Sequence, residues 1–465
     1  MDAERLEKPL ILVILGITGD LAQRKLLPAL YQLARAYELP DSLQIIGISR
    51  RAVTLDDIYG HLETYVGDGD YSDGVEQHLR KCTEIRQMDL LDPGAYTNLL
   101  NHLRDIEAAS PGGGNRLYYL SIPSQAFSPI IKLLGETGHN APIADSPELP
   151  RILIEKPFGF DLVSARELIS LLNEHFQEHQ VYRIDHYVAK ETVQNILTFR
   201  FKNPLFESIW NNRHIDHISV IAHEELDIEG RAGFYEQTGA LRDFVQNHML
   251  QLLAMTTMAR PAKLESGDIH AEKIKLMEAI KPIAPDKLAE QAVRGQYEGY
   301  QDEVKNPDST IETFARLKLW IDNEQWTGVP ILLETGKALN ERRTEISICF
   351  RQPENAAEEQ NRLVFRIQPR EGITLRLQIK RPGIQNITDA ADMEFDYARS
   401  FNQRPAEAYE RVIIDAIRGD QTLFASSAEV IRSWEIVENV LEQWLQSGEG
   451  LIRYPKGSAG PVETW

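Results

Sequence analysis

The sequence predicts two domains: an α/β domain built on a doubly wound parallel sheet, and a second, α+β domain that combines helices with a large, mainly antiparallel sheet. Three observations support this division. The chain has 465 residues, too many for one ordinary hydrophobic core. Residues before Gln180 alternate between strand-like and helix-like segments, and those after it form a succession of strand-like segments. We therefore expect domains at residues 1–180 and 181–465.

The first domain is predicted from strands and helices that follow one another in turn. Leu10–Ile17 is a continuous apolar run, as in a strand buried on both faces, and apolar residues at helical spacing follow it. This alternation is typical of right-handed βαβ units in a parallel sheet. Further strands are expected at 43–50, 83–90, 115–123 and 151–159, and helices at 22–39, 54–66, 94–106, near 130–134 and at 161–176.

The second domain is predicted from segments in which apolar and polar residues often alternate. A period of two indicates antiparallel strands with one covered face. One long apolar helix, Thr238–Ala259, interrupts the series. The expected strands lie at 214–226, 313–322, 329–337, 344–350, 362–369 and 372–380.

Composition excludes several classes of protein. Asp and Glu number 70 against 50 Lys and Arg, a balance that disfavours nonspecific binding to nucleic acid or to an anionic membrane. The first apolar run is too short to span a bilayer, and the segment before it is not basic. The two cysteines, Cys82 and Cys349, are far apart, so neither a disulfide framework nor a zinc site is expected. We expect a cytoplasmic protein without a metal.

A glycine-containing turn follows the first strand and opens the first helix. Gly16, Gly19 and Ala22 give the spacing G-x-x-G-x-x-A. In a Rossmann-type domain the pyrophosphate of a dinucleotide lies at this place, on backbone N–H groups at the helix N-terminus. The alternative is a purely structural βα turn. The expected cofactor-binding residues here are Gly16, Ile17, Thr18, Gly19, Asp20, Leu21, Ala22 and Gln23.

The end of the second strand favours NADP over NAD. NAD-binding sheets usually place Asp or Glu there, whereas this chain has Arg50 and Arg51. Guanidinium groups suit a 2′-phosphate better than a neutral diol. A solvated arginine pair is the alternative, and NAD remains the weaker cofactor candidate. The later strand ends expected along the same crevice are Met88, Asp89, Tyr119 and Lys156.

The stretch YRIDHYVAKETVQN, residues 182–195, is predicted to bind a phosphate. His186 and Lys190 are four residues apart, and with Tyr187 they offer several donors and positive charge. Lys337 and Arg342 supply further cations that favour this interpretation over a buried structural histidine. Lys156, at the end of a strand, could bind a substrate hydroxyl or form a surface ion pair.

A second histidine is a candidate general base. His248 interrupts a mostly apolar helix, together with Asp243. An unperturbed histidine has a pKa of about 6.5 and suits proton abstraction near neutrality. A carboxylate on the other ring nitrogen would fix its tautomer, and Asp185 is the candidate.

Five segments together resemble the glucose-6-phosphate dehydrogenase family, in the order in which that family has them. The resemblance spans nearly the whole chain, and the RIDHY segment is its most specific part. It implies oxidation of glucose 6-phosphate at C1, with hydride transfer to NADP, as the first step of the oxidative pentose phosphate pathway. It also implies a homodimer or homotetramer. The segments are GITGDLAQRKL, EKPFG, YRIDHYVAKETVQN, EGRAGFYEQTGALRDFVQNH and GKALNERRTEI.

The resemblance also implies roles for individual residues. His248 corresponds to the general base and Asp185 to its partner. The phosphate ligands would be His186, Tyr187 and Lys190, and the sugar-hydroxyl ligands would be Lys156, Glu224, Asp243 and Lys337.

Two positions depart from the pattern of many family members. Ala189 replaces a glycine, which would cause strain if that position needs a positive φ, although helix geometry is the favoured interpretation. Gln23 stands where a basic residue is common, which weakens the expected NADP preference. Two alternatives remain: another NAD(P)-dependent sugar oxidoreductase, and a catalytically inactive NADP-binding sensor.

Overall fold

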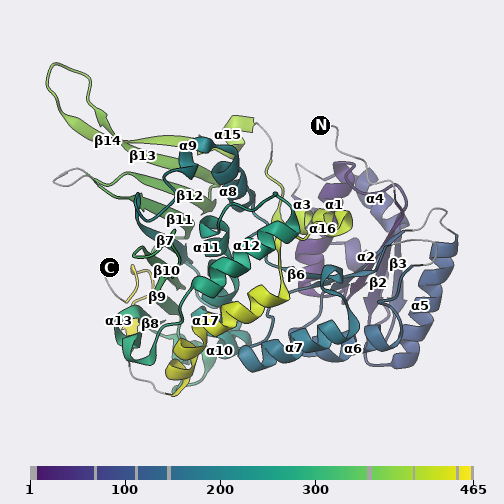
Figure 1. The fold of residues 1–465 in the computed structure, drawn as a ribbon. Helices are drawn as coiled ribbons and strands as arrows, with labels where there is room; N and C mark the ends of the chain where they lie inside the picture. The colour runs from purple at the N-terminus through teal and green to yellow at the C-terminus, as the bar shows by residue number, and fades with distance from the viewer. Residues whose placement is uncertain are drawn as a thin grey trace. The chain divides into compact units, whose positions relative to one another are not determined.

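The computed structural model describes residues 8–67, 71–109, 114–143, 148–352, 359–401, 404–446 and 450–461. The chain divides into two compact units. The first comprises Met1–Gly159, Val163–Ala189 and Ala406–Ser427, and the second comprises Phe160–Leu162, Lys190–Pro405 and Ala428–Trp465. Each unit contains one β-sheet (Figure 1).

Within the described residues, the sheet of the first unit has seven strands in the order β15-β6-β5-β4-β1-β2-β3. Strands β1 to β6 are parallel, and their order is that of a doubly wound dinucleotide-binding sheet, which confirms the predicted class. All six residues of the central strand are buried, as its apolar run predicts. The strands are β1 (Leu10–Leu15), β2 (Leu43–Ser49), β3 (Thr83–Gln87), β4 (Asn115–Leu120), β5 (Arg151–Ile154), β6 (Val181–Ile184) and β15 (Phe424–Ala425).

Helices lie on both faces of this sheet (Figure 1). The helix expected at 54–66 is two short helices, and a further helix at 73–81 was not expected from the sequence. The elements are η1 (Ala22–Leu26), α1 (Leu27–Arg35), α2 (Leu55–Tyr59), α3 (Leu62–Val66), α4 (Asp73–Lys81), α5 (Pro93–Ala108), η2 (Ser124–Ala126), α6 (Phe127–Glu136), α7 (Leu162–His175), η3 (Glu178–Gln180) and α16 (Ala408–Arg418).

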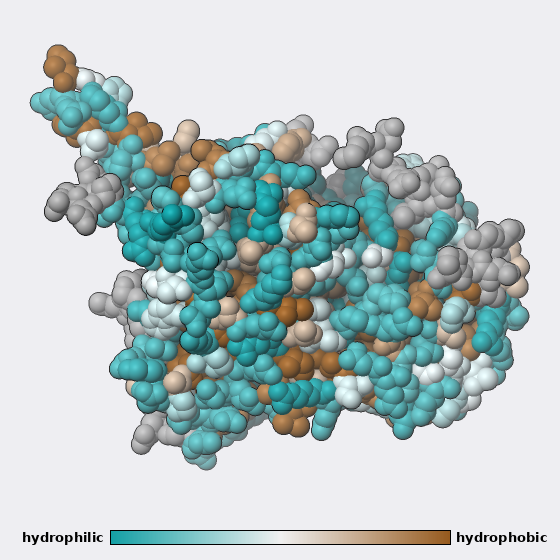
Figure 2. All heavy atoms as spheres, viewed as in Figure 1, coloured by the Kyte–Doolittle hydropathy of each residue, from teal (hydrophilic) through white to brown (hydrophobic). Residues whose placement is uncertain are grey.

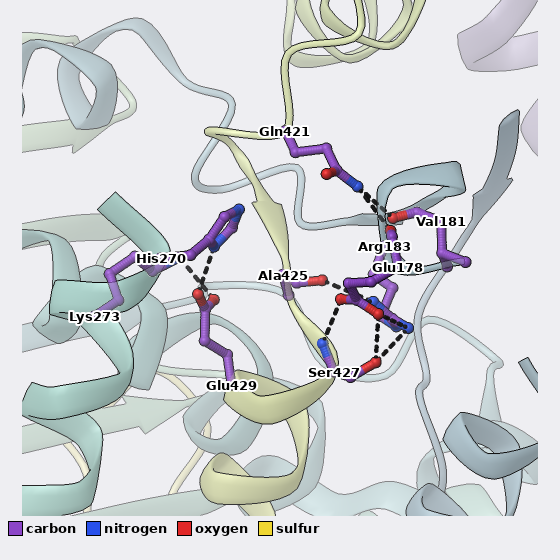
Figure 3. A network of polar contacts seen from close by, with 9 residues as sticks. All are labelled: Glu178, Val181, Arg183, His270, Lys273, Gln421, Ala425, Ser427 and Glu429. Atoms are coloured by element: carbon purple, nitrogen blue, oxygen red, sulfur yellow. Dashed lines mark hydrogen bonds and ion pairs between the residues drawn. The ribbon is translucent and has the colours of Figure 1, made fainter. Parts of the chain in front are cut away.

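The first unit also contains a segment from late in the chain. Residues 406–427 form α16 and β15, and β15 pairs antiparallel with β6. Glu178 and Arg183 hold the end of this segment: the Glu178 carboxylate accepts from the Ser427 backbone N–H at 2.8 Å, and Arg183 Nη2 donates to Ser427 Oγ at 2.7 Å (Figure 3). The expected boundary at residue 180 therefore differs from this division, because β6 extends the first sheet.

The second unit contains a sheet of nine strands within the described residues, in the order β14-β13-β12-β11-β7-β10-β9-β8-β16. Only β7 with β10 and β8 with β16 pair in parallel, so the predicted mainly antiparallel sheet is confirmed. The sequence did not predict β8, β14 or β16. The strands are β7 (Ile215–His223), β8 (Ala292–Tyr297), β9 (Phe314–Trp320), β10 (Pro330–Gly336), β11 (Arg343–Phe350), β12 (Arg362–Gln368), β13 (Gly372–Lys380), β14 (Thr388–Asp396) and β16 (Leu451–Tyr454).

Helices of the second unit include the long apolar helix, which differs from its predicted form. Gly239 has non-helical dihedrals, φ 63° and ψ 179°, so the continuous helix begins after it, as η4 (Leu241–Met249) and α11 (Leu250–Thr257). No described helix is long and apolar enough to cross a membrane. The other helices are α8 (Glu191–Lys202), α9 (Pro204–Glu207), α10 (Ala232–Ala240), α12 (Ser266–Ala279), η5 (Pro285–Lys287), α13 (Leu288–Gln291), α14 (Tyr300–Val304), α15 (Tyr397–Phe401) and α17 (Ser427–Gln446).

Strands β13 and β14 form a hairpin that projects from the sheet of the second unit (Figure 1). β14 is an edge strand, and hydrophobic side chains are exposed on the projecting part (Figure 2). Ile384 is fully exposed, and Ile379, Ile387 and Met393 are also exposed. Exposed hydrophobic side chains beside an unpaired edge strand form a surface that natural proteins usually cover.

A buried ionic cluster joins α12 to α17 in the second unit. Glu429 contacts Lys273 at 2.8 Å and His270 at 2.6 Å, and both Glu429 and Lys273 are almost fully buried (Figure 3). Burial by itself raises the pKa of Glu429, but Lys273 and His270 outweigh it and lower the pKa to about 2. The cluster therefore stabilises the folded state above the unfolded carboxyl pKa of 4.5, and this contribution is lost as the pH falls from 4.5 toward 2.

We predict that Glu429→Gln lowers the free energy of unfolding by about 3–5 kcal/mol near neutral pH, because Lys273 remains buried without its charge partner. Urea denaturation at several pH values measures this, and the difference from the parent should shrink toward acid pH. Glu435→Gln is the control on the same helix. It removes a partly exposed partner of Arg432 and should cost at most about 1 kcal/mol. Equal costs for the two variants would contradict the prediction.

Candidate active site

The glycine turn of the first unit has the geometry of a phosphate-binding loop. Gly16 follows β1 with φ +88°, and a Cβ there would lie 2.4 Å from the backbone oxygen of Ser121. Gly19 N–H donates to Gly16 O at 2.9 Å, and Gln23 N–H makes an early helical bond to Gly19 O at 3.1 Å. The N–H groups of residues 20–22 therefore stand in the first helical turn, where anions bind.

The two arginines that follow β2 are exposed, at the same edge of the sheet as the glycine turn. Arg50 and Arg51 follow β2, and within the described part of the chain neither side chain makes a hydrogen bond or ion pair. The next strand end lies alongside, because Met88 N–H donates to Ser49 O at 2.9 Å. Met88 is buried, whereas Asp89 is exposed and its carboxylate accepts from Leu91 N–H. Two cationic side chains thus remain available at this edge.

The ends of β4 and β5 contain a buried polar cluster. Tyr119 donates its hydroxyl to the Glu155 carboxylate at 2.5 Å, and Tyr409 of α16 also bonds to Glu155. Burial raises the pKa of Glu155 to about 7, against the opposing effect of these hydrogen bonds. The Tyr119 side chain is only 1% exposed, so a cofactor contact at this position would involve its backbone. Lys156 follows Glu155 and forms a cis peptide bond with Pro157.

The RIDHY segment forms a tight turn after β6. Asp185 Oδ1 accepts from Tyr187 N–H at 2.9 Å, and Ala189 N–H donates to the Asp185 carbonyl at 3.3 Å. Ala189 has no positive φ, so the strain considered for an alanine at this position does not arise. The His186 and Tyr187 rings lie 4.8 Å apart between centroids.

Lys190 lies at the end of this turn and at the start of the next helix. Its backbone is extended, with ψ 144°, and it is the N-cap of α8. The turn that begins at Asp185 therefore ends before Lys190. Lys190 is half-buried, and within the described residues its side chain makes no ion pair with a carboxylate.

Three predicted sugar-hydroxyl ligands come together in the second unit. Lys337 Nζ lies 2.5 Å from Glu224 Oε2 and 5.4 Å from the centroid of the Tyr235 ring. After burial, the charge of Asp243 is the next largest cause of the raised pKa of Tyr235, and Glu224 also contributes, so both carboxylates lie within electrostatic reach of its hydroxyl. Arg342 is exposed, and no described contact links it to this group.

His248 lies on the helix that also presents Asp243. It is 1% exposed, and its ring packs against Phe244 with centroids 5.3 Å apart. The segment Leu241–Met249 is a π-helix, in which the side chains are spaced differently from those of an α-helix. Asp185 belongs to the first unit and His248 to the second, so their pairing stays a prediction.

Glu312, which sequence reasoning missed, caps the N-terminus of this helix. Its carboxylate accepts from Leu241 N–H at 2.9 Å, and its carbonyl accepts from Ala240 N–H at 3.0 Å. A Cβ at Gly239 would lie 2.4 Å from the Glu312 carboxylate, so the glycine is required there. Glu312 is almost fully buried, which raises its pKa. No local sequence pattern marks this residue, because the bond spans 71 positions.

Three further side chains cap the C-terminus of the same helix, at the carbonyl groups of residues 255–258. Arg200 donates to the first and last of these oxygens, at 3.2 and 2.7 Å. The indoles of Trp210 and Trp326 donate to the two between them, at 2.9 and 2.8 Å. The helix that presents Asp243 and His248 is therefore fixed at both ends by buried side chains.

The fold and these features define a two-domain dinucleotide-binding protein with a polar site in its second unit. The first unit supplies a glycine turn at the head of a helix, and the second supplies a lysine–carboxylate group and a buried histidine. Among the described residues, no group of three or more His, Cys, Asp or Glu side chains could hold a metal.

Comparison with known proteins identifies the family. Residues 13–195 match the family model of the glucose-6-phosphate dehydrogenase NAD binding domain, and residues 197–464 match that of its C-terminal domain. The chain therefore belongs to the glucose-6-phosphate dehydrogenase family.

Individual relatives cover nearly all of both chains. The chain is 40% identical to a glucose-6-phosphate 1-dehydrogenase of Chlamydia pneumoniae, over 100% of this chain and 95% of the relative. It is 38% identical to that of Bacillus subtilis, over 98% and 95%. A solved structure described as glucose-6-phosphate dehydrogenase in complex with its substrate glucose-6-phosphate superposes with a TM-score of 0.90, at 33% identity, over 99% and 96%.

We predict that Glu312→Ala lowers the free energy of unfolding by about 1–3 kcal/mol, since the buried Leu241 N–H loses its acceptor. Glu312→Gln retains a carbonyl acceptor and should cost less. Urea denaturation measures both, with Glu324→Ala as the control at an exposed glutamate, expected within about 0.5 kcal/mol of the parent. If the Ala and Gln variants were equally destabilised, hydrogen bonding by Glu312 would not be the cause.

Proposed function

We propose that this chain oxidises glucose 6-phosphate at C1 to 6-phosphoglucono-1,5-lactone and transfers the hydride to NADP⁺. Membership of the family over both domains supports the reaction. The observation that carries the proposal is the group formed by Glu224, Lys337 and the Asp243 carboxylate around Tyr235. The family resemblance implies these three residues as ligands of the sugar hydroxyls, and a sugar needs such adjacent donors and acceptors.

The first unit fits a dinucleotide. The glycine turn has no room for a Cβ at Gly16, and the first helical turn offers backbone N–H groups to the pyrophosphate. Met88, Asp89 and the Tyr119 backbone would lie beside the cofactor, and Arg50 would contact the 2′-phosphate of NADP. When bound, the nicotinamide accepts the hydride from C1.

The remaining chemistry belongs to side chains of the chain itself. His186, Tyr187 and Lys190 hold the substrate phosphate, so that binding energy remote from the reaction positions C1. His248 takes the proton of the C1 hydroxyl, and Asp185 holds the other ring nitrogen and stabilises the imidazolium. Lys156 contacts a sugar hydroxyl from the first unit, and Arg342 adds positive charge toward the phosphate.

The protein acts as a homodimer or homotetramer in the cytoplasm. The exposed hydrophobic side chains on the β13–β14 hairpin support an assembly through the sheet of the second unit. No nucleic acid or membrane partner is proposed, because the chain has a formal net charge of −20.

One assay tests the reaction and separates it from the two alternatives. NADPH absorbance is followed with glucose 6-phosphate and, in parallel, with unphosphorylated glucose. We expect turnover with the phosphorylated sugar and little with glucose. Comparable rates on both sugars would favour another sugar oxidoreductase, and binding of NADP without any turnover would favour a sensor.

We predict that His248→Asn retains binding of glucose 6-phosphate but lowers kcat by roughly 10²–10⁴-fold, the usual contribution of a general base. Steady-state kinetics and equilibrium binding measure the two quantities separately. Asp185→Asn should also lower kcat and should change the pH–rate profile, because the imidazole loses its orienting charge. A near-normal kcat in His248→Asn would show that His248 is not the general base.

Lys190→Ala is expected to raise the KM for glucose 6-phosphate by about tenfold or more, since a charge-assisted contact to phosphate contributes about 1.5–3 kcal/mol. Activity toward free glucose should hardly change. Lys202→Ala, at an exposed lysine of the same helix, is the matched control. Equal losses on both sugars would show that Lys190 does not contact the phosphate.

Arg50→Ala tests cofactor choice. Loss of a charge-assisted contact to the 2′-phosphate should raise the KM for NADP⁺ by roughly ten- to a hundredfold and leave the KM for NAD⁺ almost unchanged. High salt should reduce the parent's preference for NADP⁺ over NAD⁺, because Arg50 is exposed and salt screens its interaction with the 2′-phosphate. The measurement is kcat/KM for both cofactors, with Lys132→Ala as a control for lost surface charge. A parent that prefers NAD⁺ would contradict the proposed cofactor.

A further inference from the structure

A small cavity lies in the second unit where α8 ends and α9 begins. Its volume is about 80 Å³, room for several water molecules or a small organic molecule. Three aromatic side chains, two guanidinium groups, one carboxylate and one amide surround it. These side chains are Phe201, Phe206 and Trp210, then Arg200 and Arg260, then Glu207 and Gln325.

The charges of the side chains that line the cavity do not sum to zero. Arg260 and Glu207 form a bidentate pair, at 2.6 and 2.7 Å, and both are about half exposed. Arg200 is 4% exposed, and no carboxylate of the described residues pairs with it. The cavity lining therefore has one excess positive charge, and Arg200 is its most deeply buried charged side chain.

The structural role of Arg200 leaves one of its three nitrogen atoms without a hydrogen bond. Its two Nη atoms cap the helix that ends at Thr257, and its guanidinium lies 4.5 Å from the centroid of the Phe201 ring and 5.3 Å from that of Trp210. Its buried Nε has no hydrogen-bond partner among the described residues. A buried donor of this kind usually has a partner, either protein, water or ligand.

We propose that this cavity binds a small monocarboxylate with an apolar or aromatic body. A single negative charge matches the one excess cation, whereas a phosphate dianion would exceed it. A planar carboxylate fits guanidinium donors, and the aromatic walls suit an apolar body. Burial and the neighbouring Arg260 lower the pKa of Arg200 to about 9, so its cation persists at neutral pH and gains from an anionic partner.

The probes are propanoate and benzoate, each compared with its neutral amide at constant chloride and constant ionic strength. Isothermal titration calorimetry on the full chain measures the dissociation constants, and thermal unfolding measures the stabilisation that binding to the folded state produces. We expect the carboxylates to bind with dissociation constants on the order of 1 mM and at least about tenfold more tightly than the amides, as a charged contact predicts. Inorganic phosphate should compete only weakly with benzoate.

Two variants of one ion pair locate the site. Arg260→Gln leaves Glu207 unpaired at the cavity and removes the excess charge, so carboxylate binding should weaken by about tenfold. Glu207→Gln frees the second guanidinium, so binding should tighten by several-fold. Both variants break the same half-exposed pair, which contributes little to stability. Arg260→Gln also loses the bond from Arg260 Nη2 to the Phe201 carbonyl at 3.1 Å, so the test is whether the two variants shift the affinity in opposite directions.

Four results would overturn the proposal. One is equal affinity for the carboxylates and their amides, and another is a shift of both variants in the same direction. The third is binding of phosphate more tightly than benzoate in a manner that Arg260→Gln abolishes, since that would assign a dianion to the cavity. The fourth is absence of carboxylate binding up to about 50 mM, a concentration far above the expected dissociation constant.

Discussion

The helix formed by η4 and α11 is fixed at both ends by buried side chains, and the arrangement of the second unit's polar site depends on this. Glu312 accepts the first N–H groups, and Arg200 with two indoles donates to the last carbonyls. A helix can shift along its axis or rotate when its ends are free. With both ends occupied, Asp243 and His248 are held in position relative to the end of β10, which Lys337 follows.

The same two caps link elements that are far apart in sequence. Arg200 lies on α8, whose N-cap is Lys190, so the candidate phosphate-binding lysine and the C-terminal cap belong to one helix. Glu312 lies just before β9, and the next residue, Thr313, accepts from Lys337 N–H through its carbonyl. Candidate ligands for the phosphate and for the sugar hydroxyls are thus connected to the helix through short, buried paths.

Charge is distributed unevenly in a way that suits anionic small molecules. The chain as a whole is strongly acidic, yet Arg50 and Arg51 remain without partners at the end of β2 within the described residues. Many other basic side chains of the described residues are paired with carboxylates, as with Lys273 in the cluster around Glu429. An acidic surface repels nucleic acid and anionic membranes, while a few local cations still bind a phosphate.

The sequence by itself determined the features that repeat locally. The apolar run of β1, the alternation of strands and helices, and the glycine turn predicted the first sheet, and most strands of the second were predicted from their period of two. Only the tertiary structure decided the capping by Glu312, the break at Gly239, and the return of residues 406–427 to β6. The period of two also did not predict β14, an edge strand composed mostly of polar residues. The physical reason is that these features depend on contacts between residues distant in the chain, which leave no local period to detect.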